Sequence, residues 1–150
     1  MSFQEKNIAV TLTNFSLILV FYLFRIFQMV QTEAFTPTNL FWLWGIIALL
    51  AVIGTIVATI FAHIASGIVH KAKTSEDPHF EDIQDERDKL IDLKGTKVAY
   101  TFSSIGVSLS MLAFVFGQSA LVMFALIIFF GVLAQIVADL WRLNLYRKGF

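Results

Sequence analysis

The chain has 150 residues, of which 57% are hydrophobic, whereas soluble domains are roughly 45 to 50% apolar; with a mean hydropathy of +0.75, it is expected to be an integral membrane protein. Basic and acidic residues both number 11, so no general attraction to nucleic acid follows. The absence of cysteine excludes disulfides, thiolate metal sites and cysteine nucleophiles.

Four apolar runs are each long enough to cross a bilayer as a helix, which takes roughly 20 residues. They cover residues 8–30, 40–69, 96–116 and 120–140. The N-terminus lacks the basic region and cleavage site of a signal peptide, so the first run is expected to be retained. The sequence therefore predicts an all-α membrane protein, folded as a single four-helix transmembrane bundle.

The short connections carry helix-ending signals. Thr36-Pro37-Thr38-Asn39 favours the end of one helix and the N-cap of the next. Gly117-Gln118-Ser119 predicts a tight hairpin between the last two spans.

The basic residues predict the orientation in the membrane. All except Arg25 fall on one side of a four-span arrangement. They are Lys6, Lys71, Lys73, Arg87, Lys89, Lys94, Lys97, Arg142, Arg147 and Lys148. Because basic residues favour the cytoplasmic side, we expect both termini to be cytoplasmic and the protein to reside in the inner (plasma) membrane. Trp42 and Trp44 would then mark the outer interface.

A long polar segment separates the second and third spans. Its residues predict an amphipathic cytoplasmic helix over about 77–95, begun by Ser75-Glu76-Asp77-Pro78. Ile83, Leu90 and Ile91 would form an apolar stripe resting on the membrane surface or on the ends of the spans. Gly95 would permit the bend into the third span.

Four carboxylates recur at helical spacing along this segment, at Glu81, Asp85, Asp88 and Asp92. Like charges at this spacing cost roughly 0.2 to 0.5 kcal/mol per pair, and Arg87 can offset part of that cost. These residues are candidates for binding a cytoplasmic protein partner or a divalent cation, which would need further oxygen ligands from another helix or subunit. The alternative is a solvated charged face.

Histidines near carboxylates suggest a second kind of site. The candidate metal ligands for Zn, Ni or Fe are His63, His70, His79, Glu81 and Asp82. No compact His-x-x-x-His signature is present. The alternative is a set of interfacial histidines hydrogen-bonded to the acidic helix.

Three polar residues lie within or near the ends of apolar runs. Arg25, with Gln28 one turn on, is either a ligand or ion site, or it extends outward to meet Glu33. Asp139 lies where the fourth span leaves the bilayer, and a pair with Arg142 explains it without a function.

Small residues predict close helix packing, either within the bundle or in a homodimer. They recur as Gly54, Ala58 and Ala62 on the second span, and as Thr101, Ser104 and Ser108 on the third.

One stretch carries a resemblance to a known group. Asp85-Glu86-Arg87-Asp88-Lys89-Leu90-Ile91-Asp92-Leu93-Lys94-Gly95, followed by Thr96-Lys97-Val98-Ala99-Tyr100, resembles a motif of small four-span membrane proteins of bacteria and archaea. In that group an Asp-Glu-Arg-Asp cluster, an Ile and a Lys-Gly or Arg-Gly pair precede a span. The resemblance implies a prokaryotic origin and four-span topology, and it carries no mechanism.

These features favour a non-enzymatic membrane binding or regulatory protein whose cytoplasmic acidic helix engages a partner or cation. A small transporter or channel using Arg25 is the first alternative. No carboxylate lies near the centre of any span, which argues against a proton-coupled exporter. The second alternative is a membrane metalloprotein built on the histidines and carboxylates.

Overall fold

The computed structural model describes residues 3–73 and 86–148, with the side chains of 4–57, 59–60 and 86–148. This part of the chain forms four helices: α1 (Phe3–Gln31), α2 (Pro37–Lys73), α3 (Glu86–Val115) and α4 (Ala120–Arg147). Each is long and apolar enough to cross a membrane. The prediction of an all-α protein with four candidate spans is confirmed for the described residues.

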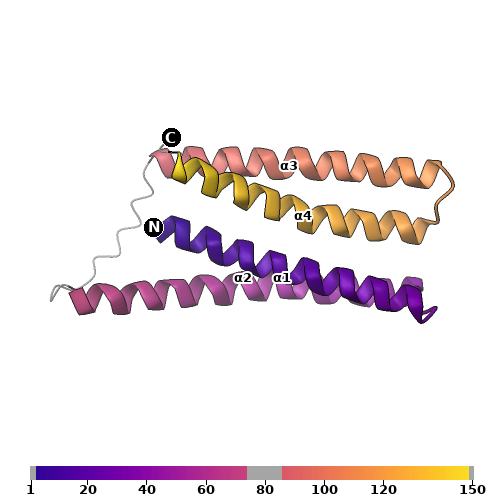
Figure 1. Ribbon diagram of the computed structural model, residues 1–150, viewed down its shortest axis with the longest axis horizontal. Coiled ribbons are helices and arrows are strands. Elements are labelled where there is room, and N and C mark those ends of the chain that lie inside the picture. Colours follow the sequence, from indigo (N-terminus) through magenta and orange to yellow (C-terminus); the bar gives the residue numbers. More distant parts are fainter. Residues whose placement is uncertain (1–2, 74–85, 149–150) are drawn as a thin grey trace.

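The helices pack in the order α3, α4, α1, α2, so that α4 lies between α3 and α1 (Figure 1). Both chain termini, the last turns of α2 and the first turns of α3 lie at the same end of the molecule, here called the terminal end (Figure 1). The two short connections lie at the opposite end, called the hairpin end. The basic residues in the predicted cytoplasmic set therefore belong to the terminal end.

The short connections end the helices as the sequence predicts. Pro37 is the first residue of α2, and the Thr36 hydroxyl accepts a hydrogen bond from the Asn39 amide at 3.4 Å. Gly117 has a φ of 95°, a left-handed conformation that glycine adopts without steric cost. Ser119 caps α4 by accepting from the Val122 amide at 3.3 Å.

Three helices build the main apolar core toward the hairpin end. Its buried residues include Ile18 and Tyr22 of α1, Leu43 of α2 and Ile128 of α4. The Tyr22 hydroxyl donates to the Ala125 carbonyl at 2.6 Å, which satisfies the one polar atom of the ring. This core joins α1, α2 and α4 into one unit.

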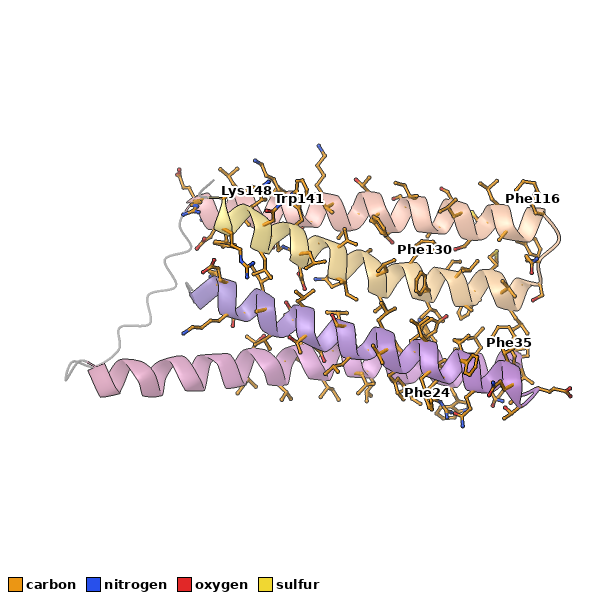
Figure 2. The ribbon with its side chains drawn as sticks, in the orientation of Figure 1. Phe24, Phe35, Phe116, Phe130, Trp141 and Lys148 are labelled. Atoms are coloured by element: carbon orange, nitrogen blue, oxygen red, sulfur yellow. The ribbon has the colours of Figure 1, made fainter. Side chains whose placement is uncertain are left out.

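The outer surface of the helices is apolar. Phe24 and Phe116 are 64% and 82% exposed, respectively, and both lie at the outside of the bundle (Figure 2). Such extensive apolar exposure is costly in water and is the ordinary state of a helix in lipid. The surface therefore fits a multi-pass membrane protein.

Close packing of α3 on α4 depends on small residues. Gly106 of α3 faces the Cβ of Phe130, and a methyl group there would collide with that ring. On the other side of the molecule, Gly54 of α2 faces the Asn14 side chain of α1. Gly54 thus serves packing within the chain, while the side chains of Ala58 and Ala62 lie outside the described set.

The predicted small polar face of α3 has a different position. Thr101, Ser104 and Ser108 are exposed, and Gly106 and Ser110 form the buried face instead. The Thr101 and Ser108 hydroxyls donate to carbonyls one turn back in their own helix. A homodimer through this face stays a prediction.

The predicted bend at Gly95 is wrong. α3 runs without interruption from Glu86 to Val115, and Gly95 is buried in its interior. The physical reason is tertiary: the missing side chain leaves room for the side chain of Arg142, so packing favours a straight helix here. The described residues do not include the first part of the predicted cytoplasmic helix. This part covers 77–85, with Ile83, and the predicted helix start at Ser75.

The apolar stripe is also corrected. Ile91 is 1% exposed, whereas the neighbouring Leu90 is 50% exposed, so these two residues face different directions. Ile91 packs into the bundle, because α4 continues past the predicted end of its span at Leu140 as far as Arg147.

Candidate functional site

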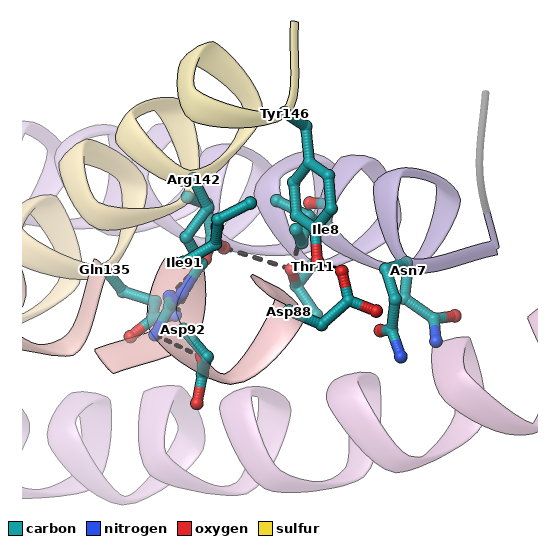
Figure 3. Close-up of a pocket in the computed structure, with 11 residues that line it drawn as sticks. Asn7, Ile8, Thr11, Asp88, Ile91, Asp92, Gln135, Arg142 and Tyr146 are labelled. Carbon is teal, nitrogen blue, oxygen red and sulfur yellow. Dashed lines mark hydrogen bonds and ion pairs between the residues drawn. The ribbon is translucent and has the colours of Figure 1, made fainter. Parts of the chain in front are cut away.

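A polar pocket of about 340 Å³ lies at the terminal end, between the start of α1, the start of α3 and the end of α4 (Figure 3). Each helix contributes polar residues at helical spacing. The lining residues are Gln4, Asn7, Ile8 and Thr11 from α1, Asp88, Ile91 and Asp92 from α3, and Gln135, Asp139, Arg142 and Tyr146 from α4.

Asp139 is the most buried charged residue in this pocket, with 2% of its surface exposed. Its Oδ1 accepts hydrogen bonds from Arg142 Nη1 at 2.9 Å and Gln135 Nε2 at 3.1 Å. Its Oδ2 accepts from the Thr11 hydroxyl of α1 at 3.0 Å. A buried carboxylate is tolerated when it is paired and hydrogen-bonded in this way.

Arg142 connects this carboxylate to α3. Its Nη2 lies 3.0 Å from Asp92 Oδ1 and 3.1 Å from the Thr96 hydroxyl. Gly95 lies directly against the Arg142 side chain, and a Cβ at that position would collide with it. Through Asp139 and Arg142, α1, α3 and α4 are therefore linked by charge-assisted hydrogen bonds.

Tyr146 fixes the first turns of α3. Its hydroxyl donates to Asp88 Oδ1 at 2.7 Å, and the Arg87 guanidinium lies 5.9 Å from the centre of its ring. A weak hydrogen bond of 3.5 Å also joins Arg87 Nη2 to the Tyr146 carbonyl. The start of α3 is thus held to the end of α4 by polar contacts.

Two buried atoms of the pocket have no hydrogen-bond partner among the described residues: Asn7 Oδ1 and Arg142 Nε. Buried polar atoms are normally paired with protein or with water. Three carboxylates face a single guanidinium across the lining, so the pocket carries net negative charge. Arg142 Nε is a donor and lies against Gly95. The acceptor Asn7 Oδ1 and the excess of carboxylates favour a group that donates hydrogen bonds and carries positive charge.

Two of the four predicted acidic residues, Asp88 and Asp92, are among the described residues. Asp88 and Asp92 lie on the same side of α3, as their spacing predicts, and both line the pocket. Each contacts an α4 side chain, Tyr146 for Asp88 and Arg142 for Asp92, and the Asp92 side chain is still 66% exposed. Glu81 and Asp85 lie outside the described residues.

The structure does not describe the side chains of the predicted metal ligands, so this prediction is untested. His79, Glu81 and Asp82 are not among the described residues, and the side chains of His63 and His70 on α2 are not described either. Within the described residues, no group of three or more His, Cys, Asp or Glu side chains could hold a metal ion.

Arg25 lies in a different place from Asp139, at the hairpin end. Its Nη1 donates to Gln28 Oε1 at 2.7 Å, and both residues line a second pocket of about 320 Å³. The expected ion pair with Glu33 is not formed among the described residues. Glu33 is exposed and has a φ of 56°, which belongs to the turn after α1.

The predicted pair of Asp139 with Arg142 is confirmed, and Gln135 also donates to Asp139. Several other site residues were not predicted from the sequence. Thr11, Asn7 and Gln4 form a polar stripe at i, i+4 and i+7 counted back along α1, and this spacing was the available signal. For Tyr146, its place near the end of the fourth span predicts only an aromatic residue at the inner membrane interface. Its hydroxyl partner could not be predicted, because it depends on how α4 lies against α3.

No protein-family model matches the chain, and no curated protein or solved structure does so.

Proposed function

We propose that this chain is a membrane binding protein whose polar pocket at the terminal end takes up a cationic ligand, specifically the ammonium group of a small amine. The proposal rests mainly on one observation, the unpartnered Asn7 Oδ1 in a pocket of net negative charge. An ammonium group supplies N–H donors and one positive charge together. Binding would satisfy the orphaned oxygen and offset the excess of carboxylates.

An ammonium group is supported over the divalent cation that the sequence also suggested. Ca²⁺ takes 6 to 8 oxygen ligands, and Mg²⁺ needs near-ideal octahedral geometry. The described carboxylates do not converge into a metal-binding group. A volume of about 340 Å³ also exceeds the share of one water molecule, roughly 30 Å³, several times over, which suits a small organic ligand.

We further propose that the pocket faces the cytoplasm of a prokaryotic cell. The orientation follows from the concentration of basic residues at the terminal end, and the prokaryotic origin from the resemblance at residues 85–100. A cytoplasmic protein that inserts a lysine side chain would present the same ammonium group. A small amine is our choice because the site is a pocket of about 340 Å³ between three helices, and a small ligand can lie among its carboxylates.

The test is the midpoint of thermal unfolding of the purified protein in detergent, with increasing 1,4-diaminobutane. A ligand that binds only the folded state raises the midpoint, and the increase grows with concentration as RT ln(1 + [L]/Kd). We expect this increase for the wild type and its loss in Asp88→Asn, which removes one carboxylate from the pocket. MgCl₂ at the same ionic strength should give a smaller effect.

Glu86→Gln is the matched control, because Glu86 is an exposed acid on the same helix that does not line the pocket. It should respond to the diamine as the wild type does. The proposal would be contradicted if the diamine did not raise the unfolding midpoint of the wild type, or if Asp88→Asn and Glu86→Gln lost this increase equally. An increase in the midpoint that is larger with MgCl₂ than with the diamine would favour a divalent metal cation as the ligand.

The transporter and metalloprotein alternatives stay predictions. Arg25 and Asp139 lie at opposite ends of the bundle, and buried apolar side chains such as Ile18 and Ile128 fill the core between them. This arrangement gives more support to binding than to passage through the bundle.

A further inference from the structure

The second pocket lies at the hairpin end, between the last turns of α1 and the first turns of α2. Its floor is apolar, formed by the buried side chains of Met29 and Leu43. Gln28 and Asn39 supply polar groups at its rim, and Arg25 supplies a positive charge. The pocket thus combines a cation with an apolar floor.

Arg25 has hydrogen-bonding capacity left over. A guanidinium carries five N–H donors in a planar fork. Among the described residues it donates to Gln28 and forms no ion pair. No Asp or Glu is among the described residues that line the pocket, so its lining carries one positive charge.

Arg25 and Trp42 lie at the same depth. By the helical rise, Arg25 is about 9 Å from the end of α1 at Gln31, and Trp42 is about 8 Å from the start of α2 at Pro37. Both line the pocket, and Trp42 is 68% exposed. Exposed tryptophans of membrane proteins gather at the level of the lipid headgroups.

An apolar track leads from this pocket along α2. Ile46, Leu49 and Ile53 follow Trp42 at i+4, i+7 and i+11, so all four share one face of the helix. These three side chains are 42%, 59% and 50% exposed. The face offers an acyl chain a surface that continues from the cation toward the middle of the helix.

From this geometry we infer that the hairpin-end pocket binds the phosphate of an acidic phospholipid, with Arg25 as the anion ligand. Arg recognises phosphate through two parallel N–H···O bonds, and Trp42 packs beside the glycerol region. An acidic lipid such as phosphatidylglycerol is preferred over phosphatidylcholine, because choline already carries a cation that partly offsets its own phosphate. The acyl chain lies along Ile46, Leu49 and Ile53.

The experiment uses the full chain in detergent, mixed with equal amounts of phosphatidylglycerol and phosphatidylcholine, with bound lipids counted by native mass spectrometry. We expect the wild type to prefer phosphatidylglycerol, with Arg25 contributing about fivefold, the effect of one basic residue at a lipid surface. Arg25→Gln should lower this preference about fivefold, and Arg25→Lys, which keeps the charge without the fork, should lower it less.

Lys97→Gln is the control, because it removes one positive charge from an exposed position of α3 far from this pocket. It should keep the wild-type preference. Inorganic phosphate, added separately, should not displace the lipid; displacement would instead assign the site to free phosphate. An unchanged preference in both Arg25 variants, or an equal loss in Lys97→Gln, would overturn the inference. Neither result bears on the polar pocket at the terminal end.

Discussion

Asp139 and Arg142 show how a charged pair is kept inside an apolar helix bundle. The carboxylate is 2% exposed, and its oxygens accept hydrogen bonds from Thr11, Gln135 and Arg142. Removing one partner of such a pair typically costs 3 to 5 kcal/mol, because the other charge is left buried without compensation. The pair therefore stabilises the arrangement of α1, α3 and α4 that forms the pocket.

Gly95 provides the first prediction, since the Arg142 side chain occupies the space that a Cβ would need. Gly95→Ala should lower the free energy of unfolding by ~1 to 3 kcal/mol, the usual range for overpacking. The lower stability would appear as a lower unfolding midpoint in detergent.

Gly131→Ala is the matched control, because nothing lies within 4 Å of a Cβ built at that position of α4. Alanine is the better helix former, so this variant should raise the free energy of unfolding by up to ~1 kcal/mol. Equal effects of the two substitutions would show that Arg142 does not occupy the space beside Gly95.

At the scale of elements, the end of α4 holds the beginning of α3. The contacts are the Tyr146 hydroxyl on Asp88 at 2.7 Å and Arg142 on Asp92 at 3.0 Å. They explain why residues 86–95 continue into the span as one helix, where the sequence favoured a surface helix and a bend. Glycine disfavours a helix interior in isolation, but close packing of α4 outweighs that preference.

Tyr146→Phe tests this role of α4. The substitution removes the hydroxyl and keeps the ring beside Arg87, so it isolates the hydrogen bond to Asp88. Hydrogen bonds to charged groups contribute ~1.5 to 3 kcal/mol. Backbone amides at the start of α3 should therefore exchange with deuterium faster, as measured by mass spectrometry of peptides that cover 86–95.

The control is Tyr100→Phe, because Tyr100 lies on α3, the helix whose exchange is measured, and is 78% exposed. Its exchange at 86–95 should match that of the wild type. Unchanged exchange in Tyr146→Phe would show that the hydroxyl does not hold the start of α3.

At the scale of the whole molecule, the helices lie in the order α3, α4, α1, α2 (Figure 1). The residues that line the two pockets belong to opposite ends of these helices. The ends differ in their number of basic residues: ten of the eleven belong to the terminal end, and Arg25 is near the hairpin end. This asymmetry predicts a fixed orientation in the membrane.

The absence of native cysteine makes this orientation directly testable. Single cysteines at Gln118, in the second hairpin, and at Lys148, after α4, should lie on opposite sides of the membrane. In intact cells a membrane-impermeant maleimide should label Gln118→Cys and spare Lys148→Cys. Permeabilised cells should label both. Labelling of Lys148→Cys in intact cells would contradict this prediction and show that the terminal end faces outward.

The fold was more predictable than the site, for a physical reason. Apolar length and cap residues act locally, so the helices and the turns at Pro37 and Gly117 follow from short stretches. The pair of Asp139 with Arg142 was also predictable, since both lie on one helix face. The contacts of Thr11 and Tyr146 cross between helices, and no local pattern encodes which helices become neighbours.

The charge of the terminal pocket is the central claim, and a thiol placed in it measures that charge directly. Asn7→Cys puts the only cysteine of the chain in the pocket lining, and Gln118→Cys at the hairpin end serves as the reference. The measured quantity is the ratio of the reaction rates with a cationic and an anionic methanethiosulfonate of similar size.

Relative to the reference, we predict a ratio more than ~100-fold higher at Asn7→Cys. One uncompensated negative charge at ~10 Å favours the cationic reagent and disfavours the anionic one by ~1.7 kcal/mol each at an effective dielectric constant of ~20, and every ~1.4 kcal/mol is tenfold. Adding Asp88→Asn should bring the ratio toward that of the reference. A ratio equal to the reference, or one that favours the anionic reagent, would contradict a pocket built to receive a cationic ligand.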